Sequence, residues 1–92
     1  MYHVYEYEAT KTCPECNVEE TVNVAAYVNE DTGKETVMAK RLNCERHGGP
    51  QVKCGLSKPI GPVTEIRMKN ADAYQYMAEK IRSGYRISNL EG

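Results

Sequence analysis

The chain has 92 residues, enough for one domain but too few for two domains with separate cores. Its net charge of −1 gives no preference for a class of partner, and no run approaches the roughly 20 apolar residues of a membrane span. Phe and Trp are absent and seven tyrosines supply the aromatic side chains, so we expect a thin core close to the surface.

The N-terminal residues do not resemble a secretion signal, because residues 1–6 contain neither a basic start nor an apolar run. We therefore expect a cytoplasmic protein whose cysteines stay reduced. In that compartment a cysteine pattern indicates metal binding or catalysis, whereas disulfides are typical of exported chains.

The first segment predicts a strand followed by a tight turn. Residues 2–9 alternate loosely and are rich in β-forming side chains, which indicates a strand. Residues 12–17 contain Pro14, which presets φ, and Asn17, which tolerates a left-handed backbone. A turn is therefore expected before the next strand.

The clearest alternation in the chain follows that turn. Apolar side chains of one parity predict a strand over residues 21–28: Val22, Val24, Ala26 and Val28. Residues 29–34 contain Gly33 and predict a hairpin loop. Residues 35–43 then return as the second, less regular strand of this hairpin.

Residues 51–69 predict short strands at the edge of a sheet. The two candidate segments, 51–57 and 62–68, are separated by a stretch that contains Pro59 and ends at Pro62. Proline has no amide hydrogen for a sheet ladder, so both segments are confined to edges or to strand starts.

The last predicted element is an amphipathic helix within residues 70–84, covering about 71–83. Asn70 is the expected N-cap and Gly84 the expected stop. Helical spacing predicts the face that packs on the core: Tyr74, Met77, Ala78, Ile81 and Tyr85. Residues 86–92 are expected to form a frayed tail.

Two pairs of metal-binding side chains flank the predicted hairpin. Cys13 and Cys16 form the first pair, and Cys44 and His47 form the second after 27 intervening residues. Two donors spaced in this way on a turn reach one ion, and a second turn facing the first completes a tetrahedral zinc site. Asn17 after the first pair and Gly48 after the second both tolerate the positive φ that such turns need.

The fourth ligand has two candidates in the sequence. His47 has the spacing of a ligand pair and is favoured, whereas Cys54, which precedes Gly55, is the alternative. A Cys₃His set favours Zn²⁺, while four thiolates also suit iron, which is the minor alternative. If Cys54 is not a ligand, it is expected to be a small buried hydrophobic residue.

At these residues the chain resembles the zinc-ribbon group of folds. The resemblance covers Cys13-Pro14-Glu15-Cys16-Asn17, the hairpin and Cys44-Glu45-Arg46-His47-Gly48, although zinc ribbons usually have a second Cys-x2-Cys and often glycine after it. It implies a zinc-stapled hairpin over residues 10–50. We therefore expect one α+β domain over 1–92, with an antiparallel sheet and a C-terminal helix.

Charge is distributed unevenly along the chain. Residues 1–36 carry two lysines and eight carboxylates, a net charge of −6, whereas residues 37–64 carry five basic side chains and one glutamate, a net charge of +4. A bipolar surface of this kind suits docking on another protein. The favoured function is a small zinc-binding adaptor or regulator that docks on a protein partner, such as a component of the nucleic-acid machinery.

Two other functions are alternatives. Direct nucleic-acid binding would use the basic segment 40–58 and a stacking tyrosine, with these candidate contacts: Lys40, Arg41, Arg46, Lys53, Lys58 and Tyr27. A thiol redox enzyme would use Cys13 and Cys16 at the start of a helix, but residues 18–28 alternate as a strand. We therefore expect no catalytic residues.

Overall fold

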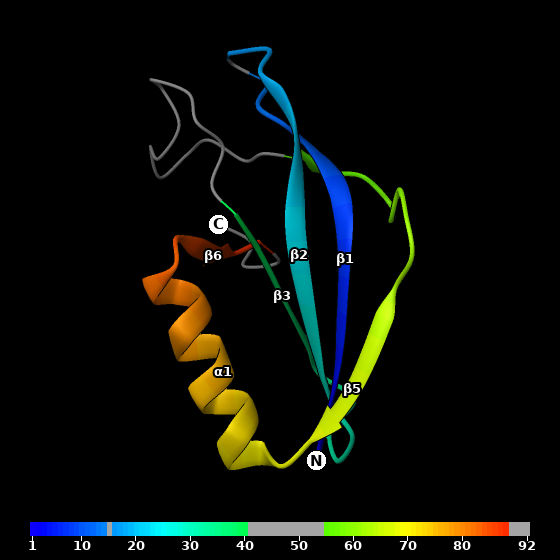
Figure 1. Cartoon of the computed structure of the whole chain (residues 1–92), viewed down its shortest axis with the longest axis vertical. Coiled ribbons are helices and arrows are strands. Elements are labelled where there is room, and N and C mark those ends of the chain that lie inside the picture. Colours follow the sequence, from blue (N-terminus) through cyan, green and yellow to red (C-terminus); the bar gives the residue numbers. More distant parts are fainter. Residues whose placement is uncertain (15, 41–54, 89–92) are drawn as a thin grey trace.

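The computed structural model describes residues 1–14, 16–40 and 55–88. Within them the chain forms a six-stranded sheet and one helix (Figure 1). The elements in chain order are β1 Tyr2–Thr12, β2 Glu19–Asn29, β3 Glu35–Lys40, β4 Gly55–Leu56, β5 Thr64–Met68, α1 Asn70–Arg82 and β6 Tyr85–Ile87. The predicted α+β class, mostly antiparallel sheet with one helix, is confirmed.

The long hairpin of β1 and β2 is the centre of the sheet. The two strands pair along their full length, from Tyr2 opposite Asn29 to Thr12 opposite Glu19. Beyond β2 follow β3 and then β6, while β4 and β5 both pair with the other side of β1 (Figure 1). All of these pairs are antiparallel.

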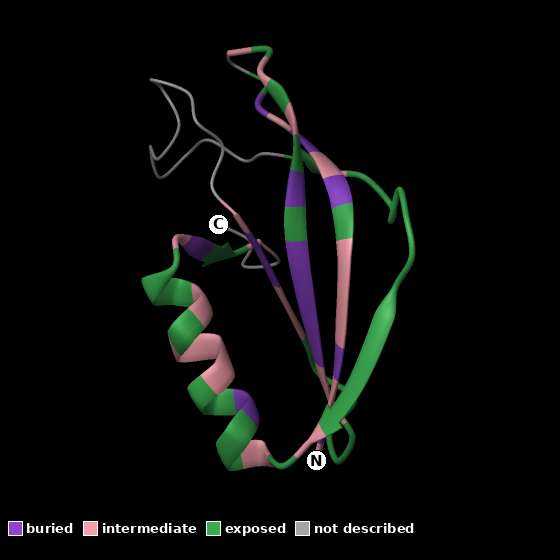
Figure 2. Cartoon of the chain, viewed as in Figure 1, coloured by how far each residue is buried: buried purple, intermediate pink, exposed green. Residues whose placement is uncertain are grey.

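One face of the sheet packs against α1 and carries the larger hydrophobic cluster. Residues paired across antiparallel strands point to the same face, so Val4 opposite Tyr27 and Ala25 opposite Met38 form one layer. The buried members of this helix-side cluster are Tyr2, Val4, Ala25, Tyr27, Met38, Ala73 and Tyr85 (Figure 2).

The opposite face of the sheet carries a second cluster near the cysteine turn. Its strand residues have the other parity, with Ala9 opposite Val22 and Val24 opposite Ala39. This cysteine-side cluster consists of Ala9, Cys13, Val22, Val24 and Ala39, with Tyr7, Cys16, Val37 and Leu56 packed against it. Its fully or nearly buried members are mainly small side chains.

Two predictions about α1 are wrong. The N-cap is Lys69, which makes no side-chain capping hydrogen bond, and Asn70 is already helical. Tyr74 and Ile81 are about half exposed, at 56% and 47%, whereas Ala73 is fully buried. The helix turns Ala73, Tyr76 and Met77 toward the sheet, so Met77 packs as predicted, while Ala73 and Tyr76 lie where Tyr74 and Ile81 were expected.

The prediction of a frayed tail is wrong for its first residues. The chain reverses at Gly84, whose φ of +97° is accessible to glycine, and β6 then pairs with β3. Lys40 lies opposite Tyr85 and Met38 opposite Ile87. Residues 89–92 lie outside the described part of the chain.

Candidate metal centre and adjacent groove

The turn that carries Cys13 and Cys16 is the tip of the β1–β2 hairpin. The amide of Cys13 donates to the carbonyl oxygen of Val18 at 2.9 Å, and the amide of Asn17 donates to the carbonyl oxygen of Cys13 at 2.9 Å. Asn17 has a φ of +55°, which closes the turn directly after the second cysteine. The tolerance of asparagine for a left-handed backbone predicts this turn from the sequence.

The two cysteines differ in burial. Cys13 is fully buried in the cysteine-side cluster, while Cys16 is partly exposed and packs against that cluster. A buried Cys13 therefore also serves as a small hydrophobic side chain. Cys16 is the thiol whose replacement disturbs packing less.

The two residues that bound segment 41–54 lie at different positions along the β1–β2 hairpin. Before the segment, the carbonyl oxygen of Lys40 accepts a hydrogen bond from the Lys11 Nζ at 3.3 Å. After it, Gly55 lies opposite Thr12, which directly precedes Cys13. The chain therefore re-enters the described part close to Cys13, whereas it leaves from the end of β3, which pairs with β2 at Val24, farther from the turn.

The remaining predicted ligands, Cys44, His47 and Cys54, lie outside the described residues. Within residues 1–14, 16–40 and 55–88, no three His, Cys, Asp or Glu side chains are grouped as a metal site. The described thiols nevertheless suit one half of a tetrahedral site, because Cys-x2-Cys on a tight turn with a positive φ after it is the geometry that zinc turns use.

The element after the cysteine turn bears on the redox alternative. Residues Glu19–Asn29 form β2, so the motif connects two strands and does not begin a helix. The helix N-terminus that lowers the pKa of a thiol in Cys-x-x-Cys redox proteins is therefore not part of this turn.

The predicted nucleic-acid contacts are not all available to a ligand. Tyr27 is fully buried in the helix-side cluster, so its assignment as a stacking face is wrong. The Lys40 Nζ donates to the carbonyl oxygen of Ser83 at 2.9 Å and lies over the Tyr85 ring. Lys58 is exposed. Three further candidates, Arg41, Arg46 and Lys53, lie outside the described residues.

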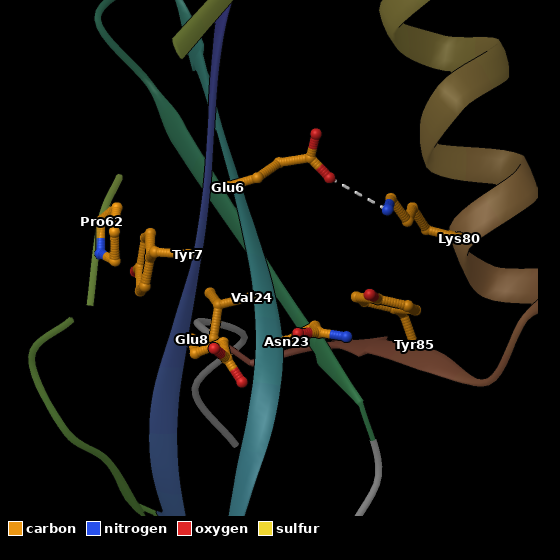
Figure 3. A pocket seen from close by; sticks show the side chains of 8 residues that line it. All are labelled: Glu6, Tyr7, Glu8, Asn23, Val24, Pro62, Lys80 and Tyr85. Atoms are coloured by element: carbon orange, nitrogen blue, oxygen red, sulfur yellow. Dashed lines mark hydrogen bonds and ion pairs between the residues drawn. The ribbon is translucent and has the colours of Figure 1, made fainter. Parts of the chain in front are cut away.

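A groove of about 330 Å³ lies along the middle of β1 and β2, with Lys80 and Tyr85 on one side of β1 and Tyr7 and Pro62 on the other (Figure 3). No pattern in the sequence predicts this groove. Its lining is mainly polar and consists of Glu6, Tyr7, Glu8, Asn23, Val24, Pro62, Lys80 and Tyr85. The charged members come from β1 and α1, which are far apart in the sequence, so no local motif could have revealed it.

One wall of the groove contains an ion pair between Lys80 and Glu6, with the side chains of Tyr76 and Tyr85 in contact with it. The Lys80 Nζ lies 3.1 Å from Glu6 Oε2, and the Tyr76 hydroxyl donates to Glu6 Oε1 at 3.2 Å (Figure 3 shows the ion pair). The Lys80 ammonium also lies 4.8 Å from the centre of the Tyr85 ring and 5.1 Å from that of Tyr76. Such cation–π contacts add to the ion pair.

The electrostatics of this wall follow from burial and from these contacts. Burial acts to lower the pKa of Lys80, but the hydrogen bond with Glu6 and the nearby Tyr85 outweigh it, and the pKa is raised. Burial raises the pKa of Tyr76, and the charge of Glu6 raises it further. Burial also raises the pKa of Tyr27, with smaller contributions from Tyr76 and Glu6. Lysine therefore stays charged and both tyrosines stay neutral at physiological pH.

Comparison with protein-family models, with curated proteins and with solved structures gave no match. The site must therefore be interpreted from its own chemistry. In the described part of the chain, no helix has both the length and the apolar character needed to cross a membrane.

Proposed function

We propose that this chain is a small zinc-binding adaptor or regulatory domain, in which a structural metal fixes the cysteine end. The observation that carries the proposal is the turn from Cys13 to Val18, with its two backbone hydrogen bonds and the positive φ of Asn17. The chain that follows the segment holding the other candidate donors lies beside this turn, with Gly55 opposite Thr12. One ion can therefore collect donors from both segments.

The proposed ligand set is Cys13, Cys16, Cys44 and one of two further donors. The Cys44-x2-His47 spacing favours His47. The pairing of Gly55 with Thr12 favours Cys54, because Cys54 is bonded to Gly55 and Thr12 is bonded to Cys13. Either choice gives four protein ligands, which leaves no open position for water or substrate. The metal then stabilises the fold and takes no part in catalysis.

The test of the metal site is elemental analysis combined with native mass spectrometry of the purified chain. We expect about one zinc per chain, because a tetrahedral set of four protein donors holds one ion. Cys16→Ser should abolish zinc binding. A chain that remains folded and metal-free after expression with added zinc would contradict the proposal.

Single variants identify the fourth ligand. Of His47→Ala and Cys54→Ser, the variant that removes the ligand should lose zinc, and the other should retain it. Each variant thus serves as the control for the other. Zinc retained by both variants would show that neither residue is needed, which would contradict the four-ligand set.

The favoured partner of this domain is a protein. Two of the candidate nucleic-acid contacts already have intramolecular partners. Tyr27 is buried, and the Lys40 Nζ donates to the carbonyl oxygen of Ser83. The groove instead offers the carboxylate of Glu8 and the amide of Asn23, whereas Glu6 is already paired with Lys80. These groups suit a basic side chain of a protein partner, because a desolvated charge needs an opposite charge and hydrogen bonds.

The partner class can be tested with Glu8→Lys and the control Glu79→Lys, which places the same charge change on an exposed helix residue. We expect peptides selected from a library of basic sequences to bind the wild type and Glu79→Lys but not Glu8→Lys. An absence of basic ligands would contradict the groove proposal. Tight binding to an oligonucleotide that weakens steeply with salt and with Lys58→Ala would instead support the nucleic-acid alternative.

A further inference from the structure

Strand β5 lies at the edge of the sheet that the described residues form. Its inner side pairs with β1 over five residue pairs, from Tyr2 opposite Met68 to Glu6 opposite Thr64. No other strand in the described residues pairs with β5. Every β5 residue before Met68 is exposed, and Figure 2 shows the strand as one continuous exposed segment.

The side chains of β5 follow a strict alternation about Ile66. Ile66 lies opposite Val4 and shares the helix-side face, yet it is 45% exposed. Glu65 and Arg67 lie opposite Tyr5 and His3 and share the other face. One apolar residue is thus flanked by one acid and one base.

This pattern is complementary to itself. If two copies of β5 pair in antiparallel register with Ile66 opposite Ile66, Glu65 of each copy lies opposite Arg67 of the other. Opposite charges directly across a strand pair stabilise it, as does contact between β-branched side chains. We propose that β5 is the dimerisation edge of this chain, through a two-fold β5–β5 pairing centred on Ile66.

The charged side chains of this edge are already held in place. Arg67 donates from Nε to Glu30 Oε2 at 2.6 Å and from its NH2 group to Glu30 Oε1 at 2.9 Å. Glu65 Oε1 lies 2.7 Å from the Nδ1 of His3. Because the guanidinium group has five N–H donors, Arg67 keeps donors for Glu65 of the second copy. Ordering these side chains before association lowers its entropic cost.

A second copy fits this edge better than an unrelated strand for reasons of symmetry. A two-fold interface places the same patch on both sides, so each residue must match its symmetry mate. Glu65, Ile66 and Arg67 meet this requirement without any further assumption about a partner. The open ladder groups of β5 would also gain hydrogen-bond partners, which removes an exposed sheet edge.

Sedimentation velocity and light scattering test the proposal on the full chain. We expect wild-type protein to approach twice the 10.4 kDa mass of the chain as concentration rises. In a homodimer, Glu65→Arg would set arginine opposite arginine and Arg67→Glu would set glutamate opposite glutamate, so each variant alone should stay monomeric. Mixed in equal amounts they should form a heterodimer, because every cross-strand pair then joins opposite charges.

Two controls distinguish loss of dimerisation from loss of folding. Circular dichroism checks each variant, and Ile66→Lys, which places like charges opposite each other at an exposed position, should also be monomeric. Wild-type protein that is monomeric up to about 1 mM, the weak end of specific association, would overturn the proposal. So would variants that still form homodimers, or monomeric variants that fail to pair when mixed.

Discussion

The two hydrophobic clusters lie on opposite faces of one sheet and differ in the size of their buried side chains. The helix-side cluster contains three of the largest fully buried side chains, Tyr27, Met38 and Val4, and it is covered by α1. The cysteine-side cluster is built from Ala9, Ala39, two valines and Cys13. The helix-side cluster therefore contains the larger buried side chains.

The difference indicates two sources of stability in one small domain. Large apolar side chains bury more area and contribute more to folding than alanine and cysteine do. Domains of this size often supplement a thin core with a metal. We therefore expect the helix-side half to depend on packing and the cysteine end to depend on the proposed zinc.

The largest expected effect comes from removing the metal. A structural zinc contributes about 10–16 kcal/mol of apparent binding energy in small zinc domains, so chelation should open the cysteine end. Hydrogen exchange should then accelerate at the amide of Cys13, which donates to Val18, and much less at that of Ala73, which donates to Lys69. Equal acceleration at both amides would remove the distinction between the halves.

Truncation of the helix-side cluster should have the next largest effect. Met38 is fully buried, so Met38→Ala should lower the free energy of unfolding by about 2–5 kcal/mol, because it leaves a cavity. Urea denaturation monitored by circular dichroism measures the change. Ile81→Ala, at a residue 47% exposed, is the control and should stay within about 0.5 kcal/mol of wild type. Similar losses for both would contradict the assigned core.

The ion pair of the groove should contribute less. Lys80→Met keeps the apolar stem but removes the ammonium that lies 3.1 Å from Glu6 Oε2. We expect a loss of about 1 kcal/mol, as for other partly buried charged hydrogen bonds after allowance for solvent screening. Lys34→Met, on an exposed loop, is the control. Because the pKa of Lys80 is raised on folding, its contribution is present at neutral pH and is lost as pH rises through the folded-state pKa.

The smallest effect at neutral pH is expected from Tyr27→Phe. The Tyr27 hydroxyl is buried and has no hydrogen-bond partner in the described residues, so its removal should change stability by less than about 1 kcal/mol or even increase it. Burial raises the pKa of Tyr27, whereas unfolded tyrosine ionises at about pH 10. Wild-type stability should therefore fall above that pH, and the fall should be smaller in Tyr27→Phe. Parallel pH profiles would contradict this assignment.

The alternation of apolar and polar residues predicts those strands that bury one face against the core. Strand β2 was predicted from the alternation of Val22 to Val28, because a half-buried strand must repeat every two residues. Strand β6 has three residues, too few to show any alternation, and its pairing with β3 depends on the reversal at Gly84. The offset of the α1 face has a similar cause, since helical spacing fits two adjacent stripes and docking on the sheet selects one.

The candidate site was predictable only where its residues are neighbours in sequence. Cys13, Cys16 and Asn17 form a turn whose metal-binding chemistry is predicted from the residue types and their spacing. Glu6 and Lys80 meet only because the sheet and α1 bring them together, so no spacing could have indicated their pairing. The prediction that Tyr27 stacks on a ligand failed for a related reason, since strand parity alone does not say which face a helix will cover.

The pairing of β6 with β3 has a consequence for how the chain matures. Strands β1, β2 and β3 are contiguous in sequence and can form a meander early, whereas the outer edge of β3 is covered only after Tyr85 has joined it. Closing so long a loop is slow relative to forming local hairpins. During synthesis on the ribosome we therefore expect the outer edge of β3 to stay unpaired until the last strand has emerged, and unpaired strand edges make incomplete chains prone to aggregation.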